Sequence, residues 1–352
     1  MEEKKKTARE IIEGYDGPPV RIMEVCGTHT HEIFRLGIRK LLPEQVELIS
    51  GPGCPVCVTQ VGFIDEAIYL ALERQVTICT FGDLVRVPGT NMSLAGARER
   101  GAKIRIVYSP VDAKEYAKEH PKEQVTFLSV GFETTTPSAC LSVKKAREEC
   151  LTNYSILTAN KTMPQAYEAL KGSADIFLYP GHVNAITGTK LCEELAKEGV
   201  SGVVAGFTAK ELLTALAVAL ARFQEGRPFF VNCYPRVVTE NGSPQAQKLV
   251  EEMMEPCDSE WRGLGVIKGS GMRLQEEWSA FDARKKYKIP LIQGKANPAC
   301  RCGDVLQGKC KPSDCKVFGK VCTPQHPVGA CMVSGEGACS AYYMYGEAEK
   351  MK

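Results

Sequence analysis

The sequence has no long apolar run and no marked excess of one charge. Its most apolar stretch, Leu212 to Ala221, is far shorter than the roughly 20 residues of a membrane-spanning helix. The first ten residues, MEEKKKTARE, lack the apolar core of a secretory signal peptide. The 44 basic and 42 acidic residues give a net charge of +2, which argues against nucleic-acid binding driven by bulk charge. We therefore expect a cytoplasmic protein that binds neither nucleic acid nor membrane.

The chain also lacks the cysteine spacings of the common small metal sites. It contains a single C-x-x-C pair, Cys54 and Cys57 in GPGCPVC, whereas a zinc ribbon needs two such pairs. It has no C-x2-C-x2-C run of the ferredoxin type. Sixteen cysteines are nevertheless present, and seven of them lie between Cys300 and Cys339. In a reducing compartment such a composition indicates metal or redox chemistry rather than structural disulfides.

Short β-branched runs alternate with helical patterns up to about residue 226. Such alternation predicts an α/β fold in which crossover helices connect parallel strands. Residues 60–74, for example, carry apolar side chains at helical spacing. Strands are expected at residues 20–25, 46–50, 76–81, 103–109, 125–130, 154–159, 175–180 and 202–207.

The eight expected strands fall into two groups of four. We therefore predict two similar parallel-sheet α/β units in tandem, residues 1–122 and residues 123–226, which divide near His120–Pro121. After residue 226 glycine and proline become frequent, and a helix is expected over residues 243–254. We interpret residues 227–352 as a third, irregular domain that a metal centre helps to fold, because metal binding can supply folding free energy.

Unusual polar residues follow several of the expected strands. In parallel sheets ligands bind beyond the carboxyl ends of the strands, so these loops are the candidate site. The loops are CGTHTH (26–31), GPGCPVC (51–57), FGD (81–83), GFETT (131–135), NK (160–161) and PGH (180–182).

Cys26 is expected at a strand end, just before a helix that begins near His29. A helix N-terminus favours an anion, so we expect the pKa of the Cys26 thiol to be lowered and its thiolate to bind a metal. His29 and His31 could be further ligands or hydrogen-bonding partners, since cysteine and imidazole together suit iron or zinc. Alternatively, the two histidines cap or pack the start of the helix.

Three interpretations of Cys54 and Cys57 remain open from the residues alone. A C-P-x-C pair ahead of a helix is typical of thiol–disulfide redox sites. One of the two thiols could instead bind a metal shared with Cys26, or the pair could belong to a merely rigid turn. For the seven C-terminal cysteines the residues predict an iron–sulfur or zinc centre held by four thiolates, without identifying the four.

Taken together, CGTHTH, GPGCPVC, GFETT and PGHV (180–183) resemble the motif set of the HypD family of hydrogenase maturation proteins. The family also has a C-x14-C-x6-C-x16-C pattern, which leaves Cys302, Cys310 and Cys331 outside it. The resemblance extends from about residue 20 to Tyr343, and at Asn184 we expect Ser in the family. The cysteines that fit the pattern are Cys300, Cys315, Cys322 and Cys339.

The resemblance implies a maturation factor for nickel–iron hydrogenase. Such proteins are scaffolds for assembly of the Fe(CN)2CO group, work with a small partner, HypC, and receive cyanide-derived ligands from HypE. The iron is held transiently between HypD and HypC, and the four cysteines of the pattern hold a [4Fe–4S] cluster, which makes the third domain an iron–sulfur domain. By resemblance the iron-site candidate is Cys26, with His29 and the Cys54–Cys57 pair nearby.

The expected mechanism links this cluster to the thiol pair. Electrons from the cluster would cycle Cys54 and Cys57 between disulfide and dithiol, while Cys26 anchors the iron. Glu133 and His182 would act as catalytic groups, and Thr134 and Thr135 as ligand-binding groups, although Glu133 could instead cap a helix. Two other function classes remain open, a stand-alone iron–sulfur-dependent thiol–disulfide oxidoreductase and a zinc-stabilised interaction module.

Overall fold

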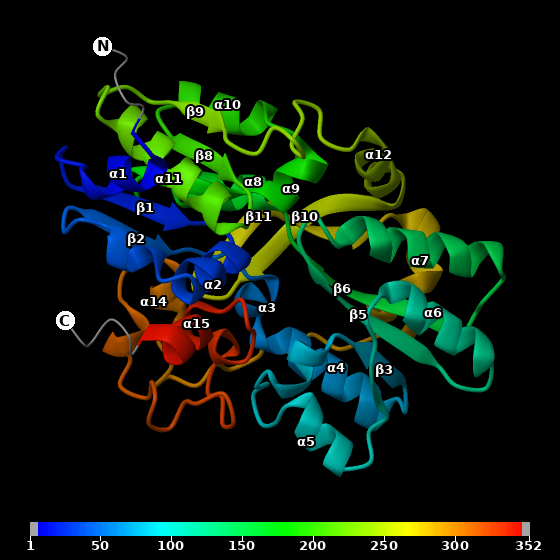
Figure 1. The fold of residues 1–352 in the computed structure, drawn as a ribbon. Coiled ribbons are helices and arrows are strands. Elements are labelled where there is room, and N and C mark those ends of the chain that lie inside the picture. Colours follow the sequence, from blue (N-terminus) through cyan, green and yellow to red (C-terminus); the bar gives the residue numbers. More distant parts are fainter. Residues whose placement is uncertain (1–5, 347–352) are drawn as a thin grey trace.

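Two parallel β-sheets and one antiparallel hairpin organise the chain, which the computed structural model describes over residues 6–346 (Figure 1). The first sheet has the strand order β2-β1-β7-β8-β9 and the second has the order β4-β3-β5-β6. The first sheet contains β1 (Val20–Glu24), β2 (Val46–Ser50), β7 (Ile176–Pro180), β8 (Ser201–Ala205) and β9 (Phe230–Asn232). The second contains β3 (Thr77–Thr80), β4 (Ile104–Ile106), β5 (Val125–Gly131) and β6 (Tyr154–Asn160).

All eight strands expected from the sequence are present, and the parallel α/β class is confirmed. The short apolar runs identified them because β5, β6, β7 and β8 are buried along their whole length. Strands covered by helices on both faces have this continuous apolar pattern.

The predicted partition into two consecutive groups of four strands is wrong. Strand β7 pairs with β1, so that Ile22 lies opposite Ile176, and β3 to β6 form a separate sheet between β2 and β7 in the chain. A division near residue 120 would therefore cut through the second sheet. Periodicity identifies a buried strand, but it carries no information about which distant strand becomes its neighbour.

Fifteen α-helices in the described chain connect and cover these strands. They are α1 (Ala8–Glu13), α2 (Gly27–Arg35), α3 (Pro55–Val58), α4 (Val61–Glu73), α5 (Leu94–Glu99), α6 (Pro110–Glu119), α7 (Thr136–Glu148), α8 (Met163–Ala169), α9 (Gly181–Thr187), α10 (Lys190–Lys197), α11 (Ala209–Phe223), α12 (Pro244–Met253), α13 (Ala283–Tyr287), α14 (Cys302–Leu306) and α15 (Ala338–Tyr345). On one face of the first sheet α1 and α11 pack on β1, β2, β7 and β8. On the other face lie α8, α10 and α14.

An antiparallel hairpin, β10 (Met254–Trp261) with β11 (Gly265–Leu274), lies between the two sheets (Figure 1). Isolated bridges join Trp261 to Thr59 and Gly271 to Lys161, so the hairpin contacts both loops through which the chain passes from one sheet to the other. The sequence reading missed this hairpin and β9, since glycines and charged side chains interrupt the apolar pattern of residues 227–274.

Residues 227–352, expected as a third domain, therefore supply β9 to the first sheet and the hairpin between the sheets. The C-terminal helix α15 packs against α2, with the Phe34 and Tyr342 rings 5.5 Å apart. In residues 6–346 no helix combines the length and the apolar character needed to cross a bilayer.

Substitution of Trp261 tests how much the β10–β11 hairpin contributes to the stability of the fold. The Trp261 side chain is fully buried, its indole N–H donates to Ser270 Oγ at 2.7 Å, and its ring stacks on Phe132. Trp261→Ala should lower the free energy of unfolding in urea by about 3–5 kcal/mol through the cavity it leaves. The control Val266→Ala, at a position on β11 that is 68% exposed, should change it by less than about 0.5 kcal/mol. Equal effects of the two substitutions would contradict this role.

Candidate metal and thiol site

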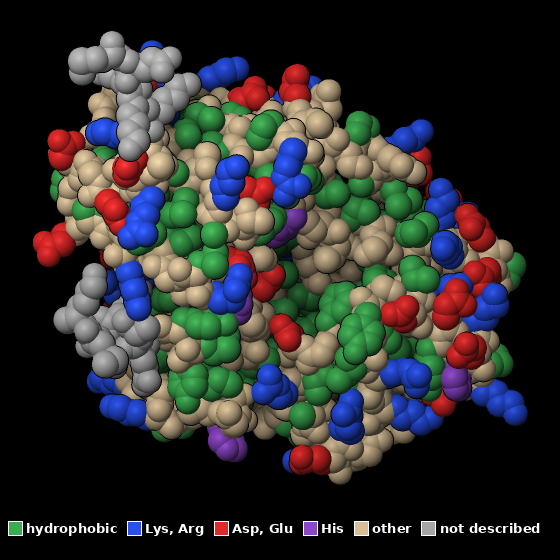
Figure 2. Space-filling view, viewed as in Figure 1, with side chains coloured by type: hydrophobic (Ala, Val, Ile, Leu, Met, Phe, Trp, Pro, Cys, Tyr) green, Lys and Arg blue, Asp and Glu red, His purple; other side chains and the backbone are tan. Residues whose placement is uncertain are grey.

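The carboxyl ends of β1, β2, β7 and β8 meet at one edge of the first sheet. Glu24, the last residue of β1, lies opposite Ser50 of β2 and Leu178 of β7, and Pro180 of β7 lies opposite Ala205 of β8. The loops that follow these strands therefore emerge side by side. They carry Cys26, Cys54, His182 and Phe207. Figure 2 shows a hollow in the middle of this view, between the two sheets, with a histidine and acidic side chains at its rim.

The Cys26 loop and the GPGCPVC loop are in backbone contact. A Cβ atom on Gly53 would lie 2.2 Å from the backbone nitrogen of Cys26, so only glycine allows this approach. The Gly27 amide donates to the Gly53 carbonyl at 3.0 Å. Within the second loop the Cys57 amide donates to Cys54 Sγ at 3.2 Å, so the Cys54 sulfur caps α3. The structure thus brings the predicted iron anchor beside the predicted redox pair.

Cys26 directly precedes the first residue of α2, as the sequence suggested. The prediction that the pKa of its thiol is lowered is wrong for the chain without bound metal. The side chain is buried, and this burial raises the pKa of the thiol to about 12, although hydrogen bonds from the His29 and Thr28 amides lower it. The free-energy cost of burying an unpaired thiolate is larger than the stabilisation that the helix N-terminus provides, so the net effect is a higher pKa. A metal ion would have to displace the proton when it binds.

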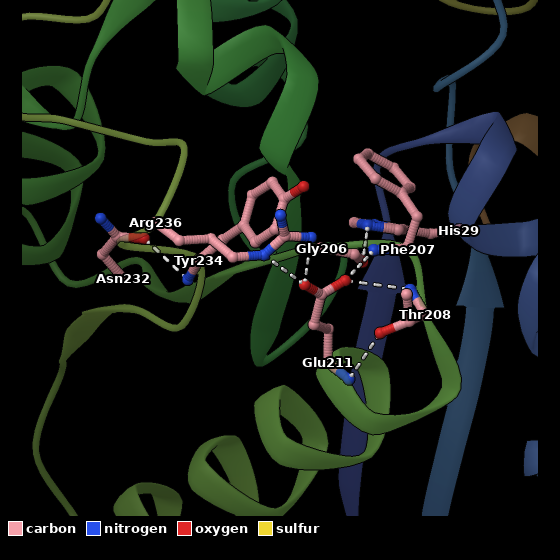
Figure 3. A network of polar contacts seen from close by, with 8 residues as sticks. All are labelled: His29, Gly206, Phe207, Thr208, Glu211, Asn232, Tyr234 and Arg236. Atoms are coloured by element: carbon pink, nitrogen blue, oxygen red, sulfur yellow. Dashed lines mark hydrogen bonds and ion pairs between the residues drawn. The ribbon is translucent and has the colours of Figure 1, made fainter.

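His29 presents a nitrogen lone pair inside the protein. Its Nε2 lies 3.0 Å from the Gly206 carbonyl oxygen, which can only accept, so Nε2 carries the hydrogen and donates it (Figure 3). Nδ1 is buried and has no hydrogen-bond partner among residues 6–346. Burial lowers the pKa of His29 to about 3, which keeps the ring neutral. A neutral imidazole held through its other N–H by a backbone carbonyl is the usual form of a metal ligand.

The Gly206 carbonyl is held in place by the start of α11. Glu211 accepts the amide hydrogens of Phe207 and Thr208, each at 3.0 Å, and is paired with Arg236 (Figure 3). The Phe207 ring lies between two histidine rings, 4.9 Å from His29 and 5.0 Å from His182. His182 is thus in the same region, and burial lowers its pKa to about 4.

Glu133 enters the site from the second sheet. Its Oε1 accepts the Met163 amide at 2.8 Å, so it caps α8, as the structural alternative proposed. Its Oε2 is buried without a hydrogen-bond partner in the described residues, and burial raises the pKa of the carboxyl group to about 7. Thr135 Oγ1 turns back toward the Phe132 carbonyl, 3.3 Å away, whereas Thr134 is half-buried and forms no side-chain hydrogen bond in the described chain.

Tyr167, which the sequence did not single out, connects these groups. Its ring is buried on α8, and its hydroxyl has no partner in the part of the chain that the structure describes. Burial raises the pKa of the phenol, and the nearby Glu133 and Cys26 raise it further. Unpartnered atoms of Glu133 and Tyr167 therefore lie in one region, within electrostatic reach of Cys26. Asn184 instead donates to Gly188 and Cys192 at the end of α9.

The segment just before α15 closes over the start of α2. Glu336 accepts the Thr28 hydroxyl at 2.7 Å, and its charge raises the pKa of Cys26. His31 Nδ1 lies 3.0 Å from the Gly335 carbonyl, so this histidine packs against the C-terminal segment rather than beside His29. Sequence reasoning missed Glu336, and the only signal was an acid between two glycines close to Cys339.

Cys331 lies between the thiol pair and the C-terminal cysteines. Its fully buried side chain is a hydrogen-bonding neighbour of the Cys57 and Cys339 thiols, and the Cys339 amide donates to Cys331 Sγ at 3.3 Å. Burial raises the pKa of Cys57, whereas the hydrogen bond with Cys331, followed by burial, raises the pKa of Cys339. The family pattern leaves Cys331 outside its four positions, yet the structure makes it the link between the CPVC loop and one of those four.

The remaining C-terminal cysteines lie around the same buried core. The Cys302 thiol lowers the pKa of Cys300 to about 7, and a Cβ on Gly329 would lie 2.5 Å from Cys300 Sγ. Cys322 Sγ accepts the Val328 amide at 3.4 Å, and its thiol is close enough to Cys300 and Cys315 to be affected by their charge. Among residues 6–346 no three Cys, His, Asp or Glu side chains are arranged to hold a metal ion.

Comparison of the sequence with known proteins identifies the family of the chain. The HypD family model, described as Hydrogenase formation hypA family, matches residues 2–346. The chain belongs to the HypD family. It is 42% identical over 347 residues to the "Hydrogenase maturation factor HypD" of Cupriavidus necator, covering 95% of this chain and 92% of that protein. The proteins of the same name from Rhodobacter capsulatus and Escherichia coli are 44% and 43% identical, each covering 94% of this chain and 90% of the relative.

The family assignment predicted from the motifs is therefore confirmed, and this HypD-family chain is a hydrogenase maturation factor. A maturation factor works with other maturation proteins. In the structure, the motifs CGTHTH, GPGCPVC and PGHV meet at one edge of the first sheet, and GFETT approaches them from the second sheet.

The buried carboxyl group of Glu133 predicts a pH dependence of stability. Its pKa is about 7 in the folded chain against 4.5 in the unfolded chain, so the favourable contribution of the protonated form is complete below pH 4.5 and lost as the pH rises through 7. Glu133→Gln, which stays neutral, should therefore stabilise the metal-free protein at pH 8 by at most about 3 kcal/mol. The gain should vanish near pH 4.5 when urea unfolding is measured at both pH values. A gain independent of pH would contradict this assignment.

Proposed function

We propose that this HypD-family chain is the cytoplasmic scaffold on which the Fe(CN)2CO group of nickel–iron hydrogenase is assembled, with HypC-type and HypE-type partners. One observation carries the proposal. Cys26 and the CPVC loop are in backbone contact, and beside them His29 presents an unpartnered Nδ1. A soft thiolate and a neutral imidazole suit iron that carries cyanide and carbonyl ligands.

In this proposal the mononuclear iron is the cargo. Cys26 binds it as a thiolate after losing its proton, and His29 is oriented toward it by the hydrogen bond from Nε2 to Gly206. A HypC-type partner covers the iron from the open side, and a HypE-type partner delivers the cyanide. The hollow between the sheets supplies the approach.

Glu133 and His182 act as proton-handling groups of this site. With a pKa of about 7, Glu133 can both donate and accept a proton near neutral pH. His182 is neutral at this pH because burial lowers its pKa to about 4, so it offers a lone pair and an N–H but no charge. The Thr135 amide donates to the Phe132 carbonyl at 3.1 Å, which closes the turn that carries Glu133, and in this proposal Thr134 and Thr135 bind the ligands of the iron.

The C-terminal thiols suit a resident iron–sulfur cluster by their chemistry. Cys300, Cys315, Cys322 and Cys339 would hold it, and the amide that donates to Cys322 Sγ is the kind of hydrogen bond that tunes such a centre. When bound, a [4Fe–4S] cluster supplies single electrons. A disulfide between Cys54 and Cys57 needs two electrons and two protons to become two thiols. Cys331 is a hydrogen-bonding neighbour of both Cys57 and Cys339, so its thiol joins one of these ligands to the pair.

The first test concerns the resident cluster. Purified without oxygen, the protein should be brown and contain about four irons and four sulfides in this centre. Cys315→Ala and Cys322→Ala should abolish the colour, because each removes a ligand. The controls Cys310→Ala and Cys331→Ala should keep it. A colourless, zinc-containing wild-type protein would favour the interaction module, and loss of colour in Cys331→Ala alone would show that the four ligands are wrongly assigned.

The second test concerns the cargo iron. In protein isolated with its partners, Cys26→Ala should lose one iron per chain while the cluster colour and the far-ultraviolet circular dichroism stay unchanged. His29→Ala should retain this iron about 10–100-fold more weakly, measured by chelator competition. The control Cys140→Ala removes a buried thiol of α7 and should change neither property. Full iron content in Cys26→Ala would leave the thiol oxidoreductase as the better explanation.

A further inference from the structure

Residues 295–322, which we call the lysine segment, have a charge unlike that of the whole chain. They contain six basic residues and two acidic ones, whereas the complete chain has a net charge of +2. All six basic side chains are exposed. They are Lys295, Arg301, Lys309, Lys311, Lys316 and Lys320. An excess of positive charge is therefore gathered in the segment that contains five of the seven C-terminal cysteines.

These lysines are not used within the fold. Arg301 pairs with Asp304 at 2.9 Å, but none of the five lysines forms an ion pair with any residue between 6 and 346. Elsewhere in the described chain both kinds of lysine occur, since Lys103, Lys114 and Lys171 each pair with a glutamate and others form no ion pair, but this segment gathers five unpaired lysines within 26 residues that carry two acidic ones. A group of unpaired cations costs free energy through mutual repulsion, and a negatively charged partner would remove that cost.

A basic hollow continues the lysine segment. It has a volume of about 680 Å³, and no aspartate or glutamate is among its lining residues. The cationic groups that line it are Arg86, Arg262 and Lys295. Arg262 is close enough to Cys300 to lower its pKa, and the wall residue Val328 donates its amide to Cys322 Sγ. The hollow thus shares a wall with the sulfur centre.

The sulfur atoms lie directly beneath this surface. Cys315 is 9% exposed and Cys322 is 6% exposed, and the exposed Lys316 and Lys320 lie between them in the chain, beside Val321, which is 65% exposed. Cations around a small apolar spot, with a redox centre just below, are the features of a weak and electrostatically steered electron-transfer contact.

We propose that the lysine segment and the adjoining hollow are the docking face for an acidic one-electron carrier protein, an inference that rests on the proposed redox function of the C-terminal thiols. Two reduced carriers dock in turn, and each gives up one electron and is oxidised. The two electrons, with two protons from solvent, break the Cys54–Cys57 sulfur–sulfur bond and form two thiols. No other reactant is needed.

The experiment compares reduction by a protein carrier with reduction by a small uncharged reductant. The double variant Lys316→Glu/Lys320→Glu is matched by Lys197→Glu/Lys210→Glu, which reverses two exposed charges on α10 and α11 that form no ion pair in the described chain, away from the segment (Figure 1). A reduced acidic [2Fe–2S] ferredoxin is the carrier, and photoreduced 5-deazariboflavin is the uncharged reductant. Carrier binding is measured separately by calorimetry with the oxidised carrier.

At low ionic strength the segment variant should bind the carrier at least tenfold more weakly and be reduced by it at least tenfold more slowly. The control variant should match the wild type, 5-deazariboflavin should reduce all three proteins equally, and added salt should remove the difference. Lys316→Gln/Lys320→Gln should give an intermediate loss.

Equal carrier binding and reduction in all variants, with a centre that 5-deazariboflavin does reduce, would overturn the docking face alone. A centre that neither reductant reduces in the wild type would overturn the proposed redox function and the docking face with it. Tighter binding of a single-stranded oligonucleotide than of the carrier, lost in the segment variant, would instead identify the surface as a nucleic-acid site and also overturn the inference.

Discussion

The approach of Gly53 to the backbone of Cys26 is the constraint on which the site depends. Because a Cβ there would lie 2.2 Å from the Cys26 nitrogen, the two loops can touch only through glycine. The strand ends below them are fixed by Glu24, whose carboxylate accepts Thr30 at 2.7 Å and Arg39 at 2.5 Å. Cys26, the proposed metal anchor, and the Cys54–Cys57 pair, from loops about 28 residues apart, thus become one rigid surface.

Burial decides the protonation states at this surface. It keeps Cys26 a thiol, His29 an uncharged base and Glu133 half-protonated near neutral pH. The metal-free site is therefore almost free of charge, which lowers the cost of closing it away from water. If Cys26 binds iron as proposed, its thiol would have to lose a proton, so loading would be favoured as the pH rises.

The sequence predicted the strands better than it predicted their partners. Buried runs such as residues 125–131 need no tertiary information to be recognised, whereas the pairing of Ile22 with Ile176 joins positions far apart in the chain and leaves no local signal. The loops of the candidate site were predictable because parallel strands deliver their carboxyl ends to one edge. Glu336 and Cys331 were not, since their positions depend on how a segment without regular periodicity folds back over α2 and α3.

The segment from Cys331 to Cys339 folds back over α2 and α3. It connects the Cys54–Cys57 loop and the start of α2 with the C-terminal cysteines. Within six residues of each other, Cys331 contacts the Cys57 thiol and Glu336 accepts the Thr28 hydroxyl beside Cys26. The same segment leads directly into Cys339, the last of the four proposed cluster ligands. Any change that shifts the position of Cys339 must therefore move groups that touch both the thiol pair and the start of α2. Through this short segment, a change in the oxidation state of the C-terminal thiols would shift the groups that contact the start of α2 beside Cys26. This structural coupling would act in addition to electron transfer.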